Sequence, residues 1–117
     1  MVGDTAAVVD VGAFTLTSYD VPAAALVDVV DAGEGPTHLV ADTQGRFLVA
    51  DTRGDAVLTF TAGPLRQVGR LPLPGTPYGL AYDPSAQRLW VTLTATNEVV
   101  ALSTACLLYT SPSPRDS

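Results

Sequence analysis

The sequence contains no lysine and no isoleucine, and it has only one cysteine, one histidine, one methionine and one tryptophan. Its six arginines are outnumbered by twelve acidic residues, which gives a formal net charge of −6 at pH 7. So little positive charge does not suit a nucleic acid or an anionic membrane, and neither is predicted as a partner. Purely apolar runs such as Ala23–Val27 are far shorter than the roughly 20 residues that a membrane-spanning helix needs.

The chain is nevertheless rich in apolar residues. Hydrophobic residues make up 47% of the 117 residues, and charged residues make up only 15%. This composition argues against disorder and predicts one modest globular domain.

Residues 106–117 differ in composition from the rest of the chain. Up to Ala105 the sequence is rich in Ala, Val, Gly, Asp, Arg and Pro, as a GC-rich coding sequence would be, whereas Cys106–Ser117 closely resembles the translation of a transposase-type sequencing adapter. We therefore expect a truncated fragment with a non-native, irregular tail over residues 106–117. A genuine Ser/Pro-rich linker is the alternative. The cysteine lies in this segment, so it says nothing about the redox compartment.

An internal repeat of about 41 residues runs through the rest of the sequence. Gly35–Asp42 aligns with Gly75–Asp83, with a proline, a leucine and an aspartate at matching places. After one inserted residue near positions 85–87, Arg46–Thr52 aligns with Arg88–Thr94. The chain is therefore predicted to hold the end of one repeat unit, one complete unit and about three quarters of another.

Each unit contains four short runs rich in Val, Leu, Thr and Phe, separated by turn residues. The strands predicted for the complete unit are Thr37–Asp42, Arg46–Asp51, Ala56–Thr61 and Gln67–Leu73. The connections of about three or four residues predict antiparallel hairpins. Pro22–Val30 has helix propensity, but its second half aligns with the fourth run of the next unit, so we predict a strand over Leu26–Asp31.

Four antiparallel strands about every 40 residues are the sequence signature of a β-propeller blade. Runs such as Phe47–Ala50 are apolar on consecutive residues, as strands are in a sheet that is covered on both faces. The predicted fold is all-β, an open arc of about two and a half propeller blades over residues 1–105. An antiparallel sandwich is the alternative, but that fold gives no reason for a sequence repeat.

The repeat units resemble those of the NHL and YVTN β-propeller families. Gly35–Val57 carries the resemblance in the complete unit, and the pattern that begins at Pro77 is similar to the YVTN form more closely. The resemblance covers residues from about 5 to 103, with one departure where Leu93 stands in place of Asp10 and Asp51 of the earlier units. It implies the fold rather than the activity, because such blades occur in lactonases, lyases, scaffolds and sensors.

The candidate ligand-binding residues are those that a propeller would place on one rim of its central channel. They are Thr37, His38, Arg53, Tyr78 and Asn97. His38 and Tyr78 stand near the start of the innermost strands, whereas Arg53 and Asn97 lie in the loops between second and third strands. Together they would supply hydrogen-bond donors, an aromatic ring and a cation around a concave mouth. Structural roles, as a hydrogen-bonded histidine and as solvated turn residues, are the alternative.

Four aspartates recur at equivalent strand ends, namely Asp10, Asp42, Asp51 and Asp83. Carboxylates can bind Ca²⁺ or act as acid and base, but aspartates that recur in every unit are better explained as turn formers that accept backbone N–H groups. No catalytic residue, metal or cofactor is predicted. The aromatic residues Trp90 and Tyr82 are predicted to pack between blades.

Two functions remain open at this point. The first is a binding or interaction scaffold, with an unidentified small molecule or protein at the rim, for which the family resemblance implies an extracytoplasmic location. The alternative is a propeller enzyme such as a sugar-lactone hydrolase, with its catalytic residues in blades outside this fragment. A quinoprotein-type propeller would need cofactor ligands that these residues do not offer.

Overall fold

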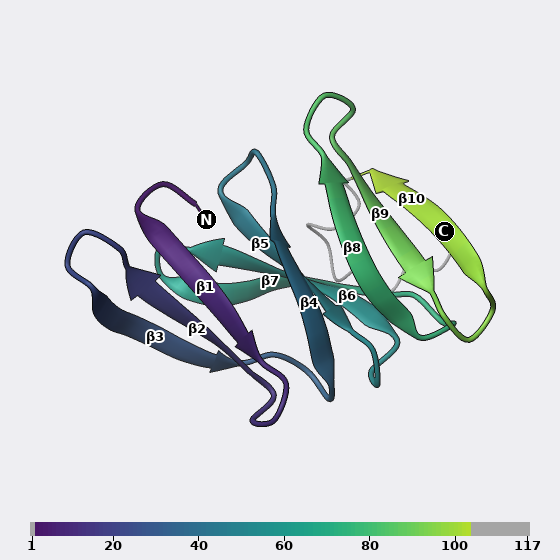
Figure 1. Cartoon of the computed structure of the whole chain (residues 1–117), viewed down its shortest axis with the longest axis horizontal. Helices are drawn as coiled ribbons and strands as arrows, with labels where there is room; N and C mark the ends of the chain where they lie inside the picture. Colours follow the sequence, from purple (N-terminus) through teal and green to yellow (C-terminus); the bar gives the residue numbers. More distant parts are fainter. Residues whose placement is uncertain (1, 104–117) are drawn as a thin grey trace.

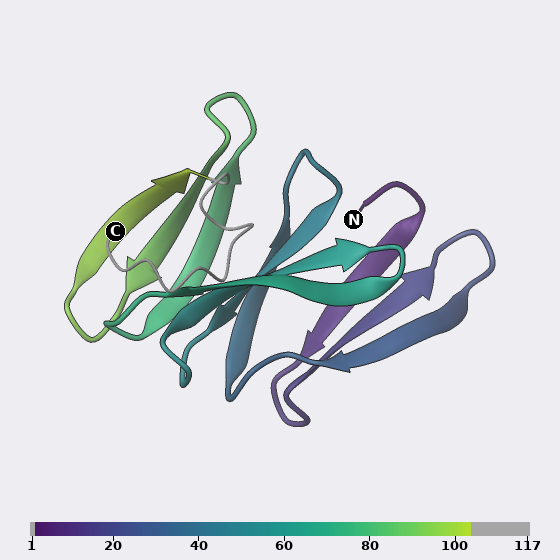
Figure 2. The same ribbon diagram turned by 180° about the vertical axis from the view of Figure 1, so that it is seen from behind.

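The computed structural model describes residues 2–103, which form three antiparallel sheets (Figures 1 and 2). The N-terminal sheet has the strand order β1-β2-β3, the middle sheet β4-β5-β6-β7, and the C-terminal sheet β8-β9-β10. The strands are β1 Thr5–Asp10, β2 Thr15–Asp20, β3 Ala25–Asp31, β4 Pro36–Ala41, β5 Arg46–Asp51, β6 Ala56–Ala62, β7 Leu65–Pro72, β8 Pro77–Asp83, β9 Arg88–Leu93 and β10 Glu98–Ser103. The predicted tail over residues 106–117 lies outside the described part.

The prediction of an all-β fold is confirmed, and the three sheets form an open array. None of the residues from 2 to 103 belongs to a helix that is long and apolar enough to cross a membrane. The segment with helix propensity ends in β3, where Val30 pairs with Leu16 of β2 and packs on the core. Tertiary packing of this face therefore outweighs the local preference of the alanines for a helix.

The repeat predicted from the sequence is visible in the strand register. Phe47 pairs with Phe60 in the middle sheet, as Ala6 pairs with Tyr19 in the N-terminal sheet. The one-residue insertion is also confirmed. Ala41 pairs with Phe47 across the turn from β4 to β5, whereas Tyr82 pairs with Leu89 across the turn from β8 to β9, so the second turn is one residue longer.

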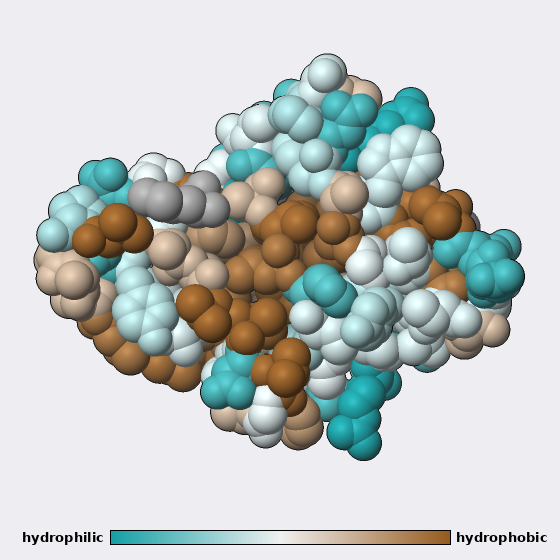
Figure 3. All heavy atoms as spheres, viewed as in Figure 1, coloured by the Kyte–Doolittle hydropathy of each residue, from teal (hydrophilic) through white to brown (hydrophobic). Residues whose placement is uncertain are grey.

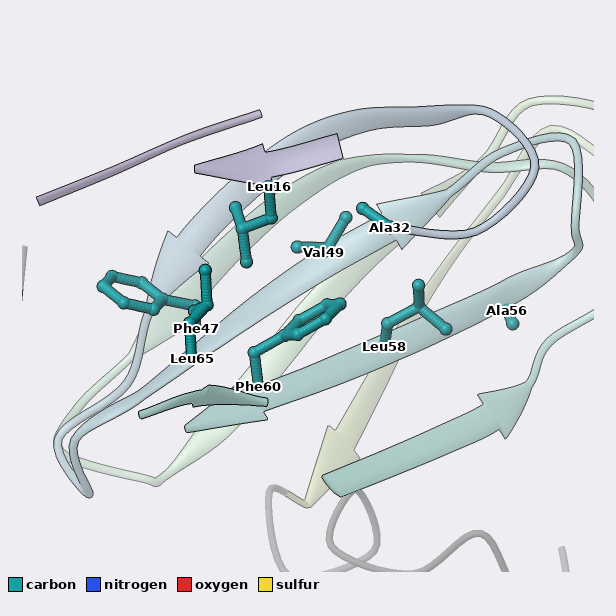
Figure 4. Packing of buried hydrophobic residues seen from close by; sticks show 8 residues of the cluster. All are labelled: Leu16, Ala32, Phe47, Val49, Ala56, Leu58, Phe60 and Leu65. Carbon is teal, nitrogen blue, oxygen red and sulfur yellow. The ribbon is translucent and has the colours of Figure 1, made fainter. Parts of the chain in front are cut away.

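The middle sheet is covered on both faces. Every residue of β5 is buried, which explains why apolar residues follow one another along this strand. One face presents Phe47, Val49, Leu58 and Phe60 to the N-terminal sheet, where Leu16 inserts between the sheets (Figure 4). On the other face Leu48 and Val57 pack against Leu89, Val91 and Leu93 of the C-terminal sheet.

The two flanking sheets are covered on one face only. Because directly opposed residues of an antiparallel ladder share a face, the strand register identifies the residues on each uncovered side. The outer face of the N-terminal sheet carries Ala6, Val8, Thr17, Tyr19, Leu26 and Val29. The outer face of the C-terminal sheet carries Ala81, Trp90, Thr92, Val99 and Ala101. Apolar side chains are visible along β3 in Figure 3, as well as in the middle of the molecule.

The prediction that Trp90 packs between sheets is wrong for this structure. Trp90 is 43% exposed, because nothing among residues 2–103 covers the outer face on which it stands. Its repeat counterpart in the middle sheet, Leu48, is fully buried under the C-terminal sheet. Tyr82 does pack as expected: its ring lies against the apolar cluster of the C-terminal sheet, and its hydroxyl is 3.1 Å from Thr43 Oγ1.

Candidate functional site

The candidate site lies where β4 and β8 begin, at the lower edge of the molecule in Figure 1. Both strands start with an irregularity in their pairing, between Pro36 and His38 in β4 and between Pro77 and Leu80 in β8. A bulge at the end of a strand redirects side chains away from the regular alternation. The two irregular starts are repeat counterparts, so the site is built from the same local device in two neighbouring sheets.

His38 and Tyr78 meet across the two sheets. Their ring centroids are 4.7 Å apart and the ring planes make an angle of 72°, which is an edge-to-face arrangement. Both side chains remain open to solvent, and Tyr78 is 47% exposed. The structure therefore brings together two of the residues predicted for the rim and leaves a polar and an aromatic surface available to a ligand.

A chain of hydroxyl groups joins the two sheets beside this ring pair. The Thr52 hydroxyl donates to the Pro77 carbonyl oxygen over 2.6 Å, and Thr37 Oγ1 lies 2.7 Å from Thr52 Oγ1. Because the proton of Thr52 is directed to Pro77, Thr37 is the donor of the shorter contact between the hydroxyls. Thr37 Oγ1 also lies 3.4 Å from the carbonyl oxygen of Tyr78. These bonds hold the start of β8, and with it the Tyr78 ring, against the middle sheet.

Asp51 connects the two loops that form this rim in the middle sheet. Its buried carboxylate accepts backbone N–H groups from Glu34 and Gly35 of the loop before β4, at 2.9–3.2 Å, and from Gly54 of the loop after β5, at 3.1 Å. A side chain at Gly33 would collide with this carboxylate, and Gly33 has a φ of 84°, so both space and conformation require glycine there. The carboxylate thus fixes the entry into β4, where Thr37 and His38 stand.

The other recurring aspartates are turn formers, as predicted. Asp10 accepts the N–H groups of Gly12 and Ala13, and Asp83 accepts those of Ser85 and Ala86. Asp42 does the same for Gln44 and Arg46. In addition, Asp42 Oδ2 accepts a bond of 2.7 Å from Nε of Arg46 in a buried ion pair.

The remaining two predicted residues have local structural roles. The aliphatic stem of Arg53 lies directly over Gly35, in the space that a side chain at position 35 would need. Asn97 stands in the exposed turn between β9 and β10 with a φ of 58°, a left-handed conformation that asparagine tolerates better than most residues. Asp55, its repeat counterpart, has a φ of 52° in the turn between β5 and β6.

Sequence reasoning missed two features of the site. It treated Asp51 as the closer of its own turn, whereas most of its bonds reach the loop before β4. It also left the hydroxyl of Thr52 without a partner, although threonine recurs at the matching position 94, where the Thr94 hydroxyl donates to the carbonyl of Thr76. The recurrence of Thr52 and Thr94 was the signal that could have revealed this role. Over residues 2–103, no group of three or more His, Cys, Asp or Glu side chains could hold a metal ion.

Comparisons with known proteins identify the fold without a family. No protein-family model matches the chain, and no curated protein matches its sequence. A solved structure that is similar is that of a protein from Lactobacillus plantarum, Northeast Structural Genomics Consortium Target LpR118, with a TM-score of 0.67 and 17% sequence identity. The match covers 95% of this chain and 40% of that chain. The all-β arrangement of three sheets is therefore shared with part of a larger protein.

Proposed function

We propose that the three sheets are consecutive blades of a β-propeller and that the chain serves as a binding scaffold through the rim formed by Thr37, His38 and Tyr78. The repeat of about 41 residues, the face-to-face packing of successive sheets and the neighbouring positions of β4 and β8 all support a propeller. The match to 40% of a larger chain of similar fold supports it as well.

The observation that carries the binding proposal is the exposed pair of His38 and Tyr78. An edge-to-face contact between two exposed rings adds about 0.5–1.5 kcal/mol of stability at most, so packing alone is a weak reason for two such residues at one rim. The threonine bonds around Pro77 hold the Tyr78 ring in place before any ligand arrives. A rigid aromatic residue beside polar groups is typical of a ligand-binding surface.

A scaffold accounts for the rim better than an enzyme does. Asp51 is the carboxylate built into the loops of this rim, and it is buried and bonded to three different backbone N–H groups. A carboxylate held in this way is occupied in positioning the loops and is not available as a base or a metal ligand. The lactone-hydrolase alternative has no comparable observation in its favour.

The test uses the single histidine and the single tryptophan of the chain as two reporters in NMR spectra. The chain is titrated with a neutral disaccharide (maltose), a dicarboxylate (succinate) and a short proline-rich peptide. We expect at least one probe to give a saturable shift of the His38 ring signals without an equal shift of the Trp90 indole signal. The variants H38A and Y78A should abolish that saturation while leaving the melting temperature within a few degrees of the original.

Two results would contradict the proposal. If none of the three probes shifted the His38 ring more than the Trp90 indole, the rim would not be a binding site for these classes of ligand. If Y78A lowered the melting temperature as much as truncation of a buried residue such as Phe60, the ring pair would be part of the core.

A further inference from the structure

The two uncovered sheet faces are repeat counterparts of the two faces that the middle sheet buries. Ala6, Val8, Thr17 and Tyr19 on the N-terminal outer face correspond to Phe47, Val49, Leu58 and Phe60, the residues that the N-terminal sheet covers. On the C-terminal outer face, Ala81, Trp90, Thr92 and Val99 correspond to Val40, Leu48, Ala50 and Val57. The C-terminal sheet covers that second set around Leu48 and Val57.

The chain itself therefore shows how such faces pack. Each of its two internal interfaces joins the face of one sheet that carries the Leu48 position to the face of the next sheet that carries the Phe47 position. The N-terminal outer face is of the second kind and the C-terminal outer face is of the first kind. The two exposed faces are complementary to each other, and they lie at opposite ends of the stack, so they cannot meet within one chain (Figures 1 and 2).

Both faces are apolar enough to require a partner. Val8 is 53% exposed and Val99 is 62% exposed, and Leu26, Val29 and Trp90 are exposed beside them. End units of soluble repeat proteins usually carry a polar outer face, because an apolar one promotes association. Contiguous exposed apolar surface of this kind marks an interaction site.

We propose that a second copy of this chain covers these faces, head to tail, so that the N-terminal outer face of one copy packs on the C-terminal outer face of the next. The contact continues the series of sheet-on-sheet interfaces already present inside the chain. It is a heterologous contact, which leads to a closed ring if the rotation between copies closes and to open oligomers if it does not. The proposal concerns the sheet faces and does not depend on ligand binding at the rim.

The experiment measures the mass of the full chain by sedimentation velocity over a range of protein concentrations. Two variants each place a charge on one face, V8D on the N-terminal outer face and V99D on the C-terminal outer face. The matched control is V21D, because Val21 is a valine of similar exposure, 46%, in the turn between β2 and β3 and away from both faces. All three variants change the net charge equally, and circular dichroism confirms that each keeps its β structure.

We expect the original chain and V21D to associate as concentration rises, and V8D and V99D each to remain monomeric when alone. Either face substitution should weaken association by at least about tenfold, since a charge must be buried in an apolar contact. An equal mixture of V8D and V99D should form dimers and nothing larger, because V8D retains an intact C-terminal face and V99D an intact N-terminal face. Only a head-to-tail contact gives this pattern.

Three results would overturn the proposal. A chain that stays monomeric at all concentrations would show that a second copy does not cover these faces, and would favour further repeat units of a longer chain. Association of V8D alone or of V99D alone would show that like faces pair with each other. Weaker association at higher salt would contradict an apolar contact between two acidic copies, whose repulsion salt should screen.

Discussion

The middle sheet and its two neighbours are made from the same repeat, yet they differ in what they bury. Phe60 is fully buried between the middle and N-terminal sheets, whereas its counterpart Tyr19 is 37% exposed on an outer face. Leu48 and Trp90 form a second pair of this kind. Equivalent positions in a repeat protein therefore contribute very different amounts to stability, because each sheet depends on the next one to cover its face.

Paired truncations on the two kinds of face should give the largest difference. Phe60→Ala is expected to lower the free energy of unfolding by about 3–5 kcal/mol, because it opens a cavity between two sheets. Tyr19→Ala should cost only about 1 kcal/mol, since much of its ring is already in contact with water. Urea unfolding followed by circular dichroism measures both, at protein concentrations where the chain is monomeric.

The same comparison revises what the sequence predicted for Trp90. With Trp90 on an uncovered face, Trp90→Ala should cost about 1 kcal/mol, and Leu48→Ala about 2–5 kcal/mol. Equal losses within either pair would mean that the outer faces are covered in the folded monomer, and the contrast between the sheets would be lost.

A second comparison concerns two aspartates at matching repeat positions. Asp51→Ala should lower the free energy of unfolding by about 2–3 kcal/mol, because three buried or half-buried N–H donors lose a charged acceptor. Asp10→Ala is the matched control, and it should cost about 0.5 kcal/mol because Asp10 holds only an exposed turn. Both values come from urea unfolding. A cost for Asp51→Ala as small as that for Asp10→Ala would show that Asp51 does not organise the rim loops.

The smallest expected effect is a gain in stability. Ser18 is buried on the inner face of the N-terminal sheet, and its Oγ finds no hydrogen-bond partner among the described residues. Ser18→Ala should raise the free energy of unfolding by about 1 kcal/mol, because an unsatisfied buried hydroxyl is removed. The exposed Ser85→Ala serves as the control and should change stability by less than about 0.5 kcal/mol. A loss of stability in Ser18→Ala would show that this hydroxyl is bonded after all.

The strands and turns could be predicted from the sequence because their signals are local. Alternating turn residues and β-branched runs placed β5 at its observed bounds, and recurrence placed β3 where propensity alone favoured a helix. The turn role of Asp10, Asp42 and Asp83 also followed from the sequence, since each bonds to N–H groups only a few residues along the chain.

The contacts of the candidate site were harder to predict because they join residues far apart in the chain. His38 touches Tyr78 only because β4 and β8 lie side by side and both begin with a bulge. The family resemblance predicted that these residues share a rim, but neither the ring contact nor the bond from Thr52 to Pro77 has a sequence signal of its own.

The sequence by itself determined the repeat, the strands within each unit and the turns that close them, since these depend on backbone preferences and hydrogen bonds between near neighbours. Only the tertiary structure decided which apolar residues are buried. Leu48 and Trp90 occupy the same place in the repeat, and the C-terminal sheet covers one while nothing among residues 2–103 covers the other. Burial depends on the presence of a neighbouring sheet, and no pattern within a single repeat unit records whether that neighbour is there.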